Sequence, residues 1–131
     1  LPISVHPHHP QKTDATNCVY MNEGIVVKSH AGQKYTSDAV SVAVFKDLCK
    51  KANVPVQFFA NRSDEAGGST LGNIAMAQVS MNSVDIGLPQ LAMHSTYETA
   101  GIKDTYYMIQ VMTEFFNSHI SEVNSHSLKV D

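Results

Sequence analysis

Gly24-Ile25-Val26-Val27-Lys28 begins the stretch of sequence that decides the fold. A short run of β-branched residues, ended by polar residues and Gly32, predicts a buried strand. Thr36-Ser37-Asp38 follows, and short oxygen-bearing side chains of this kind are typical of the residue that caps the start of a helix. The sequence therefore predicts a strand that leads, through a polar loop, into a helix.

The helix is expected to continue to about Ala52, because apolar residues recur at helical spacing through this segment. Val56-Gln57-Phe58-Phe59-Ala60 then predicts a second strand. Strands that alternate with helices indicate a layered α/β domain, with helices on the faces of a sheet. The predicted core stripe of the helix comprises Val40, Val44, Leu48 and Lys51, widened by Ala43 and Phe45.

Weaker patterns extend the same alternation toward the C-terminus. A short helix is expected over residues 72–79, and Ser83-Val84-Asp85-Ile86-Gly87-Leu88-Pro89 predicts a third strand that ends at a proline. A long helix is expected over residues 103–118, with Asp104 near its positive N-terminal end. The polar segment 117–131 is predicted to be frayed or docked on another part of the molecule. The apolar face of the long helix comprises Tyr107, Ile109, Val111, Met112, Phe115 and Phe116.

Composition excludes several classes of function. The 131 residues carry a net charge of −3 and no run of Lys or Arg, so neither nucleic acid nor an anionic membrane surface is an expected partner. No apolar run approaches the roughly 20 residues of a membrane span. Cys18 and Cys49 lack the CxxC spacing and follow no signal-peptide pattern, which indicates reduced structural thiols in a cytoplasmic protein.

Two segments have the residue types of a site. His94, in Leu91-Ala92-Met93-His94-Ser95, lies between a predicted strand and a predicted helix, where α/β proteins commonly build sites. Its imidazole is a candidate metal ligand, although taken alone such a histidine is more often structural. Gly67-Gly68-Ser69-Thr70 enters the short helix and could bring backbone amides close to an anion, although a simple turn and cap is the commoner arrangement.

Two further features are less specific. His6, His8 and His9 cluster between prolines, and adventitious metal affinity is the usual outcome of such a tract, although a metal-binding module built on it is a third, weaker hypothesis. Lys28 ends the first predicted strand close in sequence to Tyr35. From sequence alone, an exposed lysine at a strand end is the commoner interpretation.

Taken in order, five motifs closely resemble the aspartyl aminopeptidase family across nearly the whole chain. The most specific are the Gly-Ser-Thr loop and the segment 84–95, whose spacing agrees with the family. The motifs are Ser4-Val5-His6-Pro7, residues 24–28, Gln33-Lys34-Tyr35, residues 62–72 from Arg62 to Gly72, and residues 84–95.

The resemblance implies a cytoplasmic, oligomeric zinc metallo-aminopeptidase that removes N-terminal Asp or Glu from peptides with two zinc ions per full-length active site. By the same resemblance His94 is a zinc ligand, and Lys28, with Tyr35 nearby, pairs with the acidic side chain of the substrate. The loop of Gly68, Ser69 and Thr70 corresponds to a substrate-facing wall. His6 corresponds to a histidine near the active site and the subunit contacts.

Several family residues have no counterpart in this sequence: the upstream histidine, the bridging aspartate, the Glu-Glu pair that includes the general base, and an aspartate expected immediately before Leu1. Residues 1–131 are therefore interpreted as the C-terminal portion of one catalytic domain, with the general base and the dimerisation domain upstream, and as inactive in isolation. The alternative is a non-catalytic oligomerisation or interaction module derived from the same fold, which would associate through exposed sheet edges or apolar faces.

Overall fold

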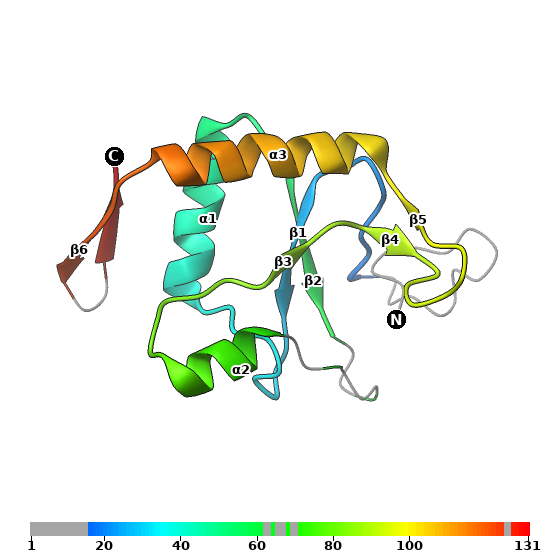
Figure 1. The fold of residues 1–131 in the computed structure, drawn as a ribbon, viewed down its shortest axis with the longest axis horizontal. Coiled ribbons are helices and arrows are strands. Elements are labelled where there is room, and N and C mark those ends of the chain that lie inside the picture. Colours follow the sequence, from blue (N-terminus) through cyan, green and yellow to red (C-terminus); the bar gives the residue numbers. More distant parts are fainter. Residues whose placement is uncertain (1–15, 62–63, 65–67, 69–70, 125–126) are drawn as a thin grey trace.

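The computed structural model describes residues 16–61, 64, 68, 71–124 and 127–131. Within these residues a small sheet lies at the centre, with helices and two short hairpins around it (Figure 1). The elements are β1 Ile25–Ser29, α1 Ala39–Lys51, β2 Val56–Ala60, α2 Leu71–Gln78, β3 Ile86–Gly87, β4 Gln90–Leu91, β5 Thr99–Ala100, α3 Ile102–Asn117, β6 Ile120–Asn124 and β7 Ser127–Val130.

The central sheet has the strand order β2-β1-β3. β1 pairs with β2 in parallel, from Ile25 opposite Val56 to Ser29 opposite Ala60, and α1 makes the crossover between them. β3 pairs antiparallel to the other edge of β1, with Val27 opposite Ile86. The predicted strand, helix and strand are therefore confirmed, and so is the α/β fold class.

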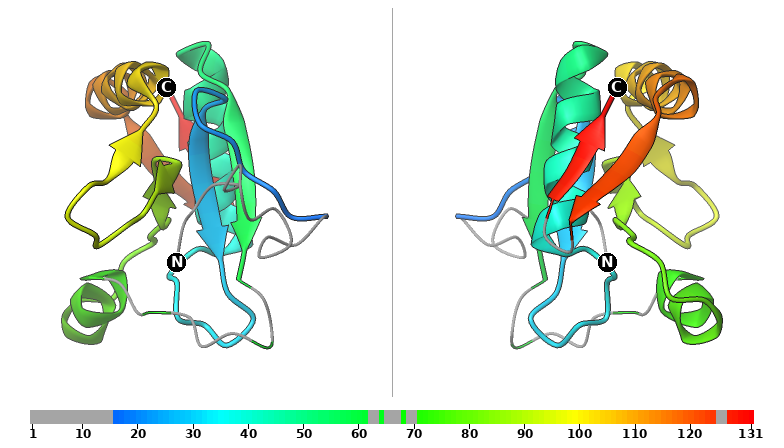
Figure 2. Two further views of the ribbon diagram at one scale, coloured as in Figure 1. Left: turned by 90° about the vertical axis from the view of Figure 1, so that its right-hand side faces the viewer. Right: turned by 90° about the vertical axis from the view of Figure 1, so that its left-hand side faces the viewer.

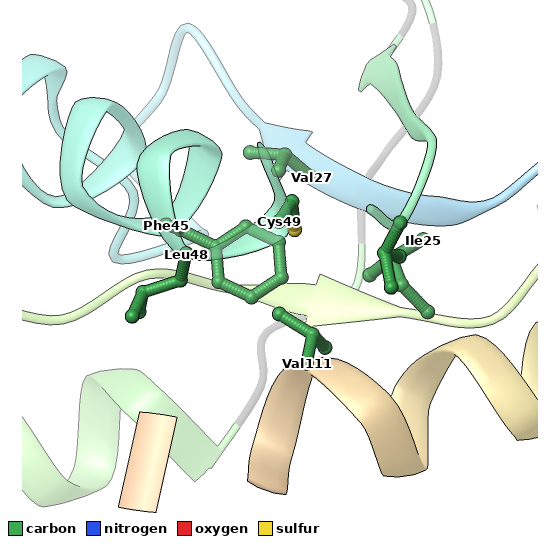
Figure 3. Close-up of a cluster of buried hydrophobic side chains, with 7 residues drawn as sticks. Ile25, Val27, Phe45, Leu48, Cys49 and Val111 are labelled. Atoms are coloured by element: carbon green, nitrogen blue, oxygen red, sulfur yellow. The ribbon is translucent and has the colours of Figure 1, made fainter. Parts of the chain in front are cut away.

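The core forms where one face of β1 meets α1 and α3. Ile25 and Val27 point toward Phe45 and Leu48 of α1, and Val111 of α3 closes the cluster (Figure 3). All five side chains are at least 96% buried. Because successive side chains of a strand point to opposite faces, this packing directs Lys28 to the face of β1 that is turned away from α1.

The start of α1 follows from the capping chemistry that the sequence predicts. The Asp38 carboxylate accepts from the amide of Ser41 at 2.8 Å, and the Ser41 hydroxyl accepts from the amide of Asp38 at 3.1 Å. The predicted core stripe is correct at Phe45 and Leu48 but wrong at Ala43 and Lys51, which are exposed. Lys51 instead donates to the carbonyl of Val130 at 2.9 Å, which ties α1 to β7.

Cys49 takes a core position that the predicted stripe lacked. Its side chain is 1% exposed, and burial raises the pKa of the thiol to about 12. A thiol with so high a pKa is a weak nucleophile at neutral pH. The burial of Cys49 in the core agrees with the structural role expected for it, and neither Cys18 nor Cys49 forms a disulfide.

The C-terminal region agrees with the prediction in part. The segment expected to be frayed or docked forms the hairpin β6-β7, closed by reciprocal backbone hydrogen bonds between His119 and Asp131, and β7 is docked against α1. The predicted third strand is shortened to the two residues of β3, which pair only with Val26 and Val27. α3 has the predicted bounds to within one residue, but Ile109 is 61% exposed, so its buried face is narrower than expected.

Asp104 on α3 is completely buried, whereas the sequence suggested only a favourable position near the helix terminus. Its carboxylate accepts from the amide of Asn22 at 2.6 Å and from the amide of Gly24 at 3.0 Å. Gly24 has a φ of +113°, and a Cβ there would collide with the carbonyl of Pro55. The start of β1 is therefore held between α3 on one side and the beginning of β2 on the other.

We expect Asp104→Ala to lower the free energy of unfolding by about 2–4 kcal/mol, because two buried amides lose their acceptor. Asp47→Ala on α1 is the matched control, since Asp47 is exposed and the change should cost less than about 0.5 kcal/mol. Urea unfolding of both variants measures the difference. Equal costs would show that the Asp104 carboxylate does not hold β1 in place.

Candidate functional site

The most distinctive polar feature is an ion pair across β1 and the segment that enters β3. The Lys28 Nζ lies 2.6 Å from Oδ1 of Asp85, and the two side chains are only 13% and 8% exposed. The backbone fixes this pairing, because the amide of Lys28 donates to the carbonyl of Asp85 at 2.9 Å. The lysine is therefore not the exposed strand-end residue that its sequence position favoured.

Tyr35 completes a cluster around this ion pair. The ammonium of Lys28 lies 5.0 Å from the centre of the Tyr35 ring, within the range of a cation–π interaction. Burial, and to a lesser extent the negative charge of Asp85, raises the pKa of the Tyr35 phenol. The ring therefore stays neutral well above physiological pH and presents a hydroxyl and an aromatic face beside the cation.

The loop between β1 and α1 is held against α2. Asn73 of α2 donates to the carbonyl of Lys34 at 2.8 Å, and Gly72 lies so close to Thr36 that a Cβ at residue 72 would collide with the threonine side chain. Gly68, in the segment that precedes α2, is exposed and has open space around it. Ser69 and Thr70 of the same predicted wall lie outside the described residues.

His94 lies after β3 and before α3, as predicted, in the loop between the short strands β4 and β5. The two short strands interpose a hairpin between the predicted strand and α3. His94 is exposed, has a φ of +67°, and its backbone amide donates to the carboxylate of Glu98. This hydrogen bond holds the backbone of the loop, and the imidazole of His94 takes no part in it.

The metal chemistry expected of His94 needs further ligands, because a zinc site in a protein usually has at least three protein donors. Within the described part of the chain, no group of three or more His, Cys, Asp or Glu side chains is arranged to hold a metal ion. The described residues therefore do not form a complete zinc site by themselves. His6, His8 and His9 lie outside the described residues.

The structure brings Lys28 and Tyr35 together, as the sequence suggested, and adds Asp85, which the sequence analysis did not select. Asp85 is a single carboxylate inside the apolar run Val84-Asp85-Ile86, and its backbone amide donates to the hydroxyl of Ser37 at 2.9 Å. A lone acidic residue in a predicted buried strand is a signal that could have identified it, because a buried charge needs a partner.

Comparison with known proteins identifies the family. Residues 3–116 match the model of the aminopeptidase I zinc metalloprotease (M18) family, so this chain belongs to the M18 metallopeptidase family. A probable M18 family aminopeptidase 2 of Clostridium novyi is 53% identical over 114 residues, which are 87% of this chain and 26% of that protein. A second probable M18 family aminopeptidase 2, from Clostridium acetobutylicum, is 46% identical over the same share of both chains.

Solved structures have the same fold. A chain of the Ape4 and Nbr1 complex superposes with a TM-score of 0.83 at 34% identity, over 86% of this chain and 22% of the other. The S. cerevisiae mApe1 dodecamer gives a TM-score of 0.73 at 24% identity, over 86% and 24% of the two chains. The sequence thus spans about a quarter of the length of these relatives. None of the described helices has the length and apolar character needed to cross a membrane.

We expect Lys28→Met to destabilise the chain by about 3 kcal/mol, because it leaves the nearly buried carboxylate of Asp85 without its cation. The double variant Lys28→Met/Asp85→Asn should be more stable than Lys28→Met, since the buried charge is then gone. Chemical denaturation measures both, with Lys50→Met as the control at an exposed position. If the double variant were the less stable of the two, the ion pair would not be the cause.

Proposed function

We propose that this chain is the C-terminal part of the catalytic domain of a zinc-dependent aminopeptidase that removes Asp or Glu from peptide N-termini. Two observations support this assignment: the M18 family match extends over residues 3–116, and the chain spans about a quarter of its relatives. The remaining catalytic groups, including the general base, would then come from the rest of a longer polypeptide. On this proposal the 131 residues alone are inactive.

The preference for acidic residues rests on Lys28. Its ammonium lies at the end of β1 beside Asp85 and Tyr35, and its side chain is 13% exposed. A slightly exposed cation in a mostly buried cluster can bind a carboxylate by a charge-assisted hydrogen bond, which a neutral side chain cannot form. This placement of Lys28 is the observation that most favours an acidic substrate.

The proposal assigns three further contributions to the site. His94 would supply one zinc ligand from the β4-β5 loop, in a site with two zinc ions per full-length polypeptide. The loop of Gly68, Ser69 and Thr70 would form a wall of the substrate pocket at the start of α2. His6 would lie near the active site or a subunit contact.

We also propose that the full-length protein is a cytoplasmic homo-oligomer. One structural neighbour is described as a dodecamer, and the described part of this chain carries exposed apolar side chains suited to burial in a larger assembly. α2 has no buried residue, and its Leu71 and Ile74 are 82% and 63% exposed. The same observation favours the alternative of a non-catalytic interaction module, which would be folded and of defined size but would show neither zinc nor peptidase activity.

His94→Ala in the full-length protein should lower the bound zinc by about one ion per chain if His94 is a ligand, because a site that loses one of its few protein donors binds the metal far more weakly. Metal analysis of the purified protein measures this. His119→Ala is the control, since His119 is exposed on the C-terminal hairpin. Unchanged zinc in His94→Ala would rule out ligation by this residue.

Lys28→Met in the full-length protein should reduce kcat/KM for a peptide with N-terminal Asp by about 10–100-fold relative to one with N-terminal Ala, as expected for the loss of one charged hydrogen bond. The ratio of the two rates measures selectivity independently of the fraction of active protein. Lys50→Met should leave the ratio unchanged. A wild-type protein that prefers alanyl or leucyl substrates would contradict the proposed specificity.

A further inference from the structure

We infer that Asp85 is a positioning residue that sets the selectivity for acidic substrates. It fixes the ammonium of Lys28 in the position in which that ammonium binds the carboxylate of a substrate side chain. This inference rests on the proposed function of Lys28 and concerns how that function is achieved. Asp85 is not itself expected to contact the substrate. It acts through the lysine.

The geometry makes Asp85 a rigid partner. Its carbonyl accepts from the amide of Lys28, its amide donates to the hydroxyl of Ser37, and its carboxylate lies 2.6 Å from the lysine Nζ. The backbone is therefore held on both sides of the side chain. With 8% of that side chain exposed, the carboxylate has little room to move away from Lys28.

Lysine needs such a partner, because its ammonium is a point charge on a flexible four-carbon stem. The group has three N–H donors. One donor is directed at Asp85. The same ammonium lies over the Tyr35 ring, with Nζ 5.0 Å from the ring centre. Among the described residues these are the two groups that contact the charge, and they leave a donor for an incoming carboxylate.

Asp85 also carries a negative charge, which opposes the approach of an acidic substrate. Two effects therefore compete: ordering of Lys28 favours the substrate carboxylate, and repulsion from Asp85 disfavours it. The 2.6 Å contact holds the ammonium of Lys28 against Asp85. A substrate carboxylate that approaches the other side of the ammonium would have the positive charge between it and Asp85, attracting both. Ordering should dominate, so removal of the Asp85 charge is expected to reduce selectivity.

The test uses the full-length protein and peptides with N-terminal Asp or Ala. Asp85→Asn should lower the ratio of kcat/KM for the Asp peptide to kcat/KM for the Ala peptide by about tenfold, mainly through a higher KM for the Asp peptide. Asp85→Glu should restore part of the ratio, because it retains the charge. Asp47→Asn, an exposed carboxylate on α1, is the matched control and should leave the ratio unchanged.

A double-mutant cycle shows whether Asp85 acts through Lys28. In the Lys28→Met background, Asp85→Asn should have no further effect on the ratio. A purely structural role for Asp85 would lower both activities together and leave the ratio where it was. The ratio is internal to each preparation, so partial unfolding of a variant does not obscure the result.

Two kinds of failure can be separated. If the wild type prefers Asp peptides and Lys28→Met abolishes that preference, but Asp85→Asn keeps or raises it, the role of Asp85 is refuted and the proposed function stands. An additive effect of Asp85→Asn in the Lys28→Met background refutes it equally. If the wild type shows no preference for acidic residues, the proposed specificity fails, and the inference fails with it.

Discussion

The hydrogen bonds from the amides of Asn22 and Gly24 to the buried carboxylate of Asp104 fix the position of the central strand. They attach the first turn of α3 to the chain where it enters β1, although the two segments are about 80 residues apart in sequence. Val111 lies seven residues further along α3, on the same face of the helix, and is completely buried in the core. The two hydrogen bonds to Asp104 therefore determine both where β1 starts and which face of α3 points into the core.

The position of β1 also determines where Lys28 of the candidate site lies. Ile25 and Val27 pack against α1, so the alternation of the strand directs Lys28 to the opposite face. A slip of one residue in the pairing of β1 with β2 would exchange these faces and bury the lysine in the apolar core. The register that places the core also places the cation. The views of Figure 2 show α1 on one face of the sheet, and residues 16–24, which lead into β1, cross the other face.

Local chemistry in the sequence was sufficient to predict the elements with strong signals. The β-branched run identifies β1, the oxygen of Asp38 identifies the start of α1, and the aromatic run identifies β2. Long-range contacts account for what was missed. An aspartate near a helix start is already favourable at the protein surface. The local sequence around Asp104 therefore does not show that its carboxylate is buried and accepts hydrogen bonds from distant backbone amides. The partner of Lys28 lies in the segment that enters another strand, β3, so the burial of Lys28 depends on a pairing that local periodicity does not reveal.

The two parts of the candidate site differ in how much of their structure this segment supplies. The cation, its counterion and the adjoining ring all come from the elements around β1, and both the ion pair and the cation–π contact are made between described residues of this segment. For the metal part, the described residues contribute the one proposed ligand His94, which lies in the exposed loop of a short hairpin. If the proposed function is correct, substrate selectivity is encoded locally, in a strand and loop that fold around one ion pair. Metal binding then depends on side chains that converge from distant parts of the sequence. On that proposal, substitutions around β1 would alter which residue is removed without altering the metal ligands.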